Sequence, residues 1–212
     1  MFNTIDSSVK EKIEQAPPGS IFFSDSFLEL GSARAVAKTL ERLTKKSKLQ
    51  RVAPGIYVKP EMDPFIGTVS PGMDAIAHAI AKRDKARIVP TGEYALNRLG
   101  LSTQLPMNLV YLTDGAARKV KIGKRTITFK KATPKNVAAI GPISRLVIQA
   151  LRSIGQENLT ENEKAKIIRV LQKETLENIQ HDILLAPEWI RKIMRPVIHQ
   201  MQKDEKSNSG MA

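Results

Sequence analysis

Apolar residues recur at helical spacing between Ser32 and Lys46, and polar residues fill the positions between them. At 100° per residue, three apolar side chains fall within about 60° of one another, and three cations gather on the opposite side. The apolar residues are Val36, Leu40 and Leu43, and the cations are Arg34, Lys38 and Lys45. One side of this helix is therefore suited to a protein core, while the other presents positive charge.

Short elements flank that helix on both sides. Residues 24–30 predict a short helix, and Gly31 provides a corner before Ser32, whose hydroxyl suits a helix N-cap. Residues 49–58 predict two strands joined at Pro54-Gly55, the layout of a wing. A helix, a glycine corner, a basic helix and a hairpin in this order predict a winged helix-turn-helix in residues 1–62.

The following segment, residues 63–202, predicts a mixed α/β domain. The stretch from Pro60 to Gly72 is rich in proline and glycine, which indicates a linker or an ordered crossing between domains. Residues 119–122 and 126–129 alternate with period two around Gly123-Lys124, which predicts a hairpin.

The remainder of the chain is predicted to be helical. Thr160 and Glu163 have the spacing of a capping box, and Pro196 is expected to kink or end the last helix. Residues 203–212 are polar and predict a disordered tail. The fold class is therefore α+β: an N-terminal winged helix-turn-helix followed by a mixed α/β domain that ends in helices.

Positive charge is concentrated in two places. The chain has 212 residues with 34 Lys plus Arg against 21 Asp plus Glu, a net charge of +13. Residues 32–60 hold eight basic residues and one acid, and residues 115–156 hold ten basic residues and no acid. Both segments favour polyanionic partners.

The first basic segment supplies the candidate DNA contacts. Side chains near the N-terminal end of a recognition helix reach base edges, so Ser32, Arg34 and Lys38 are the base-reading candidates. The candidate phosphate contacts are Arg42, Lys45, Arg51 and Lys59. An amphipathic helix with a solvated basic face is the alternative interpretation.

The second basic segment centres on the hairpin of residues 118–131, where seven of fourteen residues are basic. Its exposed-patch candidates are Lys119, Lys121, Lys124 and Arg125. They form either an electrostatic platform for nucleic acid or an acidic partner, or a solvated face whose lysines protect an edge strand.

Several kinds of chemistry are not expected. The chain has no cysteine, and its three histidines lie far apart, so no disulfide or metal site is predicted. No paired carboxylates follow Gly19-Ser20 or Gly31-Ser32, as a two-metal nucleotidyltransferase would require. We therefore expect a protein without catalytic activity or cofactor. No secretory signal or membrane-spanning run is apparent, which predicts a cytoplasmic location.

Two blocks of the sequence resemble a known family. Gly31-Ser32 with the apolar helix positions and the run Leu49-Gln50-Arg51-Val52-Ala53-Pro54-Gly55-Ile56-Tyr57 resembles the N-terminal winged helix of AbiEi-type antitoxins. The run from Pro90 to Gln104, PTGEYALNRLGLSTQ, followed by Val110-Tyr111-Leu112-Thr113-Asp114-Gly115 is similar to the second domain of that family. The resemblance covers about residues 5–130.

The resemblance implies an antitoxin of a type IV toxin–antitoxin, or abortive infection, system. Such a protein represses its own operon through double-stranded DNA, at an inverted repeat, and neutralises a nucleotidyltransferase-like toxin without necessarily binding it stably. The alternative is an RNA-binding or toxin-substrate-shielding protein without sequence-specific DNA binding.

Overall fold

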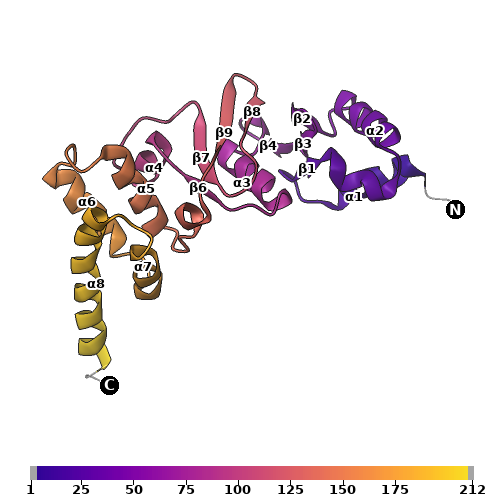
Figure 1. Cartoon of the computed structure of the whole chain (residues 1–212). Coiled ribbons are helices and arrows are strands. Elements are labelled where there is room, and N and C mark those ends of the chain that lie inside the picture. The colour runs from indigo at the N-terminus through magenta and orange to yellow at the C-terminus, as the bar shows by residue number, and fades with distance from the viewer. Residues whose placement is uncertain (1–3, 210–212) are drawn as a thin grey trace. The chain divides into compact units, whose positions relative to one another are not determined.

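A computed structural model describes residues 4–209 of the chain (Figure 1). By contacts the chain divides into two compact units. The first holds the residues up to Ile80 together with Val120–Thr126, and the second holds Ala81–Lys119 and the residues from Ile127 onward. The fold is α+β, as predicted.

The first unit begins with a winged helix-turn-helix. Its elements in chain order are α1 (Ile5–Gln15), β1 (Ile21–Phe23), the 3₁₀ helix η1 (Ser24–Leu30), α2 (Ala33–Lys45), β2 (Gln50–Ala53) and β3 (Ile56–Val58). The three strands form an antiparallel sheet in the order β1-β3-β2. The β2–β3 hairpin turns at Pro54-Gly55, where Gly55 has a φ of +71° that favours glycine.

The sequence explains how α2 is placed. The Ser32 hydroxyl accepts a hydrogen bond from the backbone N–H of Ala35 at 3.4 Å, as expected of an N-cap. Val36, Leu40 and Leu43 are buried together with residues of α1 and η1, including Val9 and Phe27. At Gly31, an added Cβ would approach Ile5 side-chain atoms to 2.4–3.0 Å, so any larger residue at this corner would displace the Ile5 side chain.

Residues 60–72 do not form an open linker. They contain β4 (Glu61–Asp63) and β5 (Gly67–Val69), which pair as an antiparallel hairpin. A domain boundary between residues 62 and 63 would cut β4, and the division by contacts lies further along, between Ile80 and Ala81. Proline and glycine here mark the turn of a hairpin rather than an irregular connection.

Most residues of a second sheet belong to the second unit. This sheet has the order β6-β7-β9-β8, with β6 (Ile88–Pro90) antiparallel and β9 (Arg125–Lys131) parallel to β7 (Leu109–Thr113). The remaining strand, β8 (Arg118–Ile122), is joined to β9 through Gly123 at a φ of +57°. Helix α3 (Met73–Arg83) precedes β6, and α4 (Glu93–Arg98) follows it.

The chain then forms the 3₁₀ helix η2 (Pro134–Val137) and four helices: α5 (Ser144–Ile154), α6 (Glu161–Leu171), α7 (Leu176–Ile183) and α8 (Glu188–Ser209). Their apolar faces share one core that includes Leu151, Leu171 and Ile190. The predicted capping box is present, because Thr160 and Glu163 each accept a hydrogen bond from the other's backbone N–H.

The end of the chain differs from the sequence-based expectation. Helix α8 continues through Pro196 and includes residues 203–209, where a disordered tail was expected, and residues 210–212 lie outside the described part. Local hydrogen bonds support this last stretch: Gln200 donates to Asp204 at 2.9 Å, and the Ser207 hydroxyl donates to the Lys203 carbonyl at 3.0 Å. The polar composition of residues 203–212 suggested disorder, because composition does not indicate these hydrogen bonds.

Candidate nucleic-acid interface

The exposed face of α2 carries two cations beside two small residues. Arg34 and Lys38 are exposed, and so are Ala33 and Ala37, which lie on the same side of the helix. Methyl side chains beside two cations allow a helix to approach a surface closely while the cations reach past them. This face is opposite the buried positions of α2 and has the geometry expected of a recognition helix.

Two further cations of α2 are held in ion pairs. Lys45 lies 2.7 Å from a carboxylate oxygen of Glu41, and this hydrogen bond raises the pKa of Lys45 and lowers that of Glu41. Arg42 forms an ion pair with Asp6 of α1. Both pairs are exposed, so a phosphate group would have to compete with a carboxylate for each cation.

Lys59 has a structural role in this fold. Its ammonium donates to the backbone carbonyls of Glu14 at 2.8 Å and Ala16 at 2.6 Å, at the C-terminal end of α1. A cation stabilises these carbonyls, which have no partner within the helix. Lys59 is therefore not grouped with the exposed cations, whereas Arg51 of the wing strand β2 is exposed.

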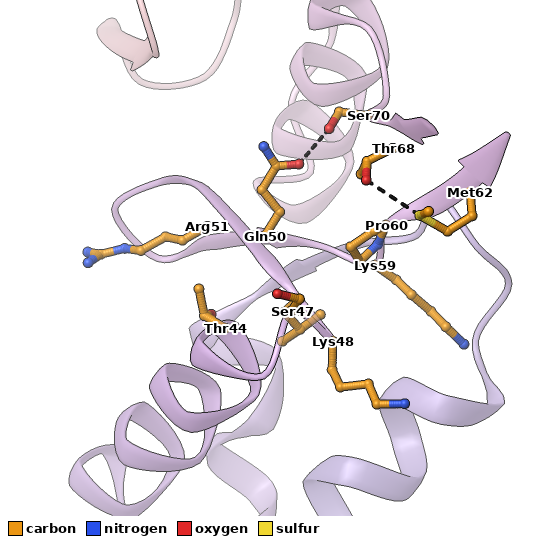
Figure 2. Close-up of a pocket in the computed structure, with 11 residues that line it drawn as sticks. Thr44, Ser47, Lys48, Gln50, Arg51, Lys59, Pro60, Met62, Thr68 and Ser70 are labelled. Atoms are coloured by element: carbon orange, nitrogen blue, oxygen red, sulfur yellow. Dashed lines mark hydrogen bonds between the residues drawn. The ribbon is translucent and has the colours of Figure 1, made fainter. Parts of the chain in front are cut away.

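A groove of about 950 Å³ lies in the first unit beside the wing (Figure 2). The end of α2, strand β2 and the β4–β5 hairpin all contribute to its lining, and the charged lining residues are Lys48, Arg51 and Lys59. In Figure 2, the side chain of Arg51 extends away from Lys59 and Met62. Sequence periodicity missed Lys48, because it follows the end of α2 in a turn.

The four patch residues of the second basic segment are exposed on one hairpin. Lys119 and Lys121 alternate along β8 with the half-buried Val120, and Lys124 and Arg125 lie at the turn into β9. Arg118, at the start of β8, is different: it pairs with Asp84 and lies over the Phe129 ring at 5.5 Å. Burial lowers the pKa of Arg118, with a contribution from Arg83.

A buried polar cluster at the start of α5 was not predicted from the sequence. Asp182, which is fully buried, accepts hydrogen bonds from the backbone N–H groups of Ile140 and Gly141, both at 2.9 Å, and from the hydroxyl of Ser144. Glu174 accepts from the N–H groups of Ile143 at 2.7 Å and Ser144 at 3.2 Å.

This cluster has the geometry of a structural site rather than a catalytic one. Burial alone raises the pKa of Glu174, but hydrogen bonds from Asn178 and from the backbone outweigh it, so the pKa lies below its ordinary value. His181 contacts Asp182 at 2.7 Å from the exposed side. Because Ser144 is fully buried and donates to a carboxylate, it is not placed to attack a substrate.

The described residues, 4–209, contain neither a metal-binding cluster nor a membrane-spanning helix. No three His, Asp or Glu side chains are grouped there in a way that could hold a metal ion. No helix within these residues has the length and apolar character needed to cross a membrane.

Comparisons with known proteins place the chain in a family. A family model described as a family of unknown function, DUF6088, matches residues 8–179. The crystal structure of the RV2827C protein from Mycobacterium tuberculosis is similar over 89% of this chain and 79% of that chain, with 10% sequence identity and a TM-score of 0.42. No curated protein sequence matches significantly. Because the family match extends from α1 into α7, the chain belongs to the DUF6088 family, whose function is unknown.

Proposed function

We propose that this protein is a DNA-binding antitoxin of a type IV toxin–antitoxin system, acting in the cytoplasm without catalysis of its own. It binds an inverted repeat in its own operator through the winged helix-turn-helix and neutralises a nucleotidyltransferase-like toxin. The antitoxin part of this proposal is supported by the family resemblance of the two sequence blocks.

One observation supports the DNA-binding part most strongly. Arg34 and Lys38 project from the exposed face of α2, in a helix-turn-helix whose wing strand carries the exposed Arg51. A recognition helix in the major groove reads bases with such side chains, and wing cations contact the backbone. The exposed alanines of α2 leave room for the groove walls.

Base reading and phosphate contact can be separated by two variants. Arg34→Ala should cost about 1–3 kcal/mol of operator binding and relax specificity at one base-pair position. Lys45→Ala should weaken binding to all sequences alike and by less, because its partner Glu41 already competes for the charge. Fluorescence anisotropy with operators that differ by single base pairs measures both. Equal losses on operator and scrambled DNA for Arg34→Ala would contradict base reading by this residue.

The basic hairpin favours a second candidate function, RNA binding or shielding of the toxin's substrate. Changing Lys119, Lys121 and Lys124 to alanine distinguishes the two. If the lysines contact DNA phosphates, the slope of log K against log salt should become less negative by up to about 3. Unchanged DNA binding with lost protection of toxin-expressing cells would assign them to the toxin pathway instead. Alanine at the exposed Lys166, Lys173 and Lys192 gives a control with the same change of charge.

A further inference from the structure

The β4–β5 hairpin, residues 61–69, exposes apolar side chains that have no role in the first unit's core. Phe65 is 95% exposed, Ile66 76% and Met62 72%. We call this hairpin the arm and residues 63–67 its tip. Grouped apolar side chains on the outside of a protein mark a contact site.

The arm is ordered before any partner arrives. Asp63 holds the tip by accepting hydrogen bonds at one carboxylate oxygen from the backbone N–H groups of Phe65 at 2.8 Å and Ile66 at 3.0 Å. The base of the arm is tied to the wing, because the Ser70 hydroxyl donates to the Gln50 amide oxygen at 2.6 Å (Figure 2). A pre-ordered contact surface loses little conformational entropy on binding.

The charge of the arm argues against DNA as its partner. Residues 61–69 contain Glu61 and Asp63 and no lysine or arginine. Apolar wedges that enter the minor groove are accompanied by cations, and a carboxylate at the tip would be repelled by phosphates. The chain as a whole carries +13, so the acidic arm is complementary to other surfaces of the same protein.

The groove beside the wing carries positive charge, which is complementary to the acidic arm. Its charged lining residues are cations, with Lys48 and Lys59 on the side where Met62 lies, and Arg51 extends away from them (Figure 2). Its volume of about 950 Å³ is comparable to that of pockets that enclose small molecules, so it has room for two apolar side chains. Lys59 is already bound to α1 carbonyls, which leaves Lys48 as the cation for an incoming carboxylate.

We propose that the partner is a second copy of this chain. The arm of each copy lies in the groove of the other, with Phe65 and Ile66 inserted and Asp63 facing Lys48. Arm and groove are neighbours within one unit, and a surface that carries both halves of a complementary contact pairs with itself about a two-fold axis. This inference goes beyond DNA binding and does not depend on it.

Sedimentation equilibrium of the full chain without DNA tests the proposal. The wild type should show a concentration-dependent monomer–dimer equilibrium, and Phe65→Ser with Ile66→Ser should raise its dissociation constant at least about tenfold. Asp63→Asn keeps an oxygen acceptor for the tip but removes the charge, so it should weaken the dimer and reduce its salt dependence. Leu105→Ser with Met107→Ser, which changes two exposed apolar residues elsewhere, is the control and should leave the dimer unchanged.

Disulfide trapping tests the contact itself, since the chain has no cysteine. When a copy carrying Ile66→Cys is mixed with a copy carrying Thr68→Cys, the two should form a mixed disulfide. A copy carrying Leu105→Cys, mixed with the same Thr68→Cys copy, should not. A wild type that stays monomeric, or a tip variant that dimerises as the wild type does, would overturn the proposal. Dimers that fail to bind operator DNA would support it and count against the proposed function.

Discussion

Replacing Asp182 with alanine should lower the free energy of unfolding by about 3–5 kcal/mol, the range seen when one partner of a buried charged network is removed. The carboxylate is fully buried and accepts from two backbone N–H groups and the Ser144 hydroxyl. Alanine would leave the Gly141 N–H and the Ser144 hydroxyl buried without this acceptor. The loop before α5 would then separate from α7, and the helical core around Leu151 would loosen.

Urea unfolding followed by circular dichroism measures this effect. Asp204→Ala, at an exposed position of α8 where the carboxylate accepts only from the exposed Gln200 in the contacts described, should stay within about 0.5 kcal/mol of the wild type. An Asp182→Ala protein as stable as that control would show that the cluster does not hold the start of α5.

Reversing the charge on the exposed face of α2 should abolish specific DNA binding. Arg34→Glu with Lys38→Glu replaces two attractions to the duplex with two repulsions, at a cost of several kcal/mol, which corresponds to at least about a thousandfold loss of affinity. Neither side chain packs in the core, so the melting temperature should change little. Titration of labelled operator DNA at fixed ionic strength gives the affinity.

The matched control separates the site from the overall charge. Lys203→Glu with Lys206→Glu makes the same change of net charge at exposed positions of α8. This control should retain operator binding within about tenfold, since neither lysine is among the proposed DNA contacts. A similar loss for both double variants would mean that binding reports net charge rather than contact through α2.

The elements of the winged helix-turn-helix were predictable because local chemistry determines them. Val36, Leu40 and Leu43 repeat at helical spacing, Ser32 caps the helix, and Pro54-Gly55 allows a tight turn. The same reasoning succeeded at the capping box of α6. These features depend on neighbours within a few residues, so the sequence alone contains them.

Long-range partners of side chains could not be predicted in the same way. Lys59 was expected on a phosphate and instead caps α1, more than forty residues earlier, and Arg42 pairs with Asp6. The buried Glu174 and Asp182 look like ordinary helix-surface acids in a polar segment, because the donors in residues 140–144 that they accept from lie thirty or more residues away. Only the fold brings such groups together.

Binding of the wild-type protein to its own upstream region, compared with a scrambled duplex of equal length and composition, tests the central claim most directly. At physiological salt, we expect the upstream inverted repeat to bind at least about 10³-fold more tightly than the scrambled DNA. Protection of the bound DNA from nuclease cleavage should be centred on the two halves of the inverted repeat. Equal affinity for the two duplexes would contradict the account of α2 as a recognition helix.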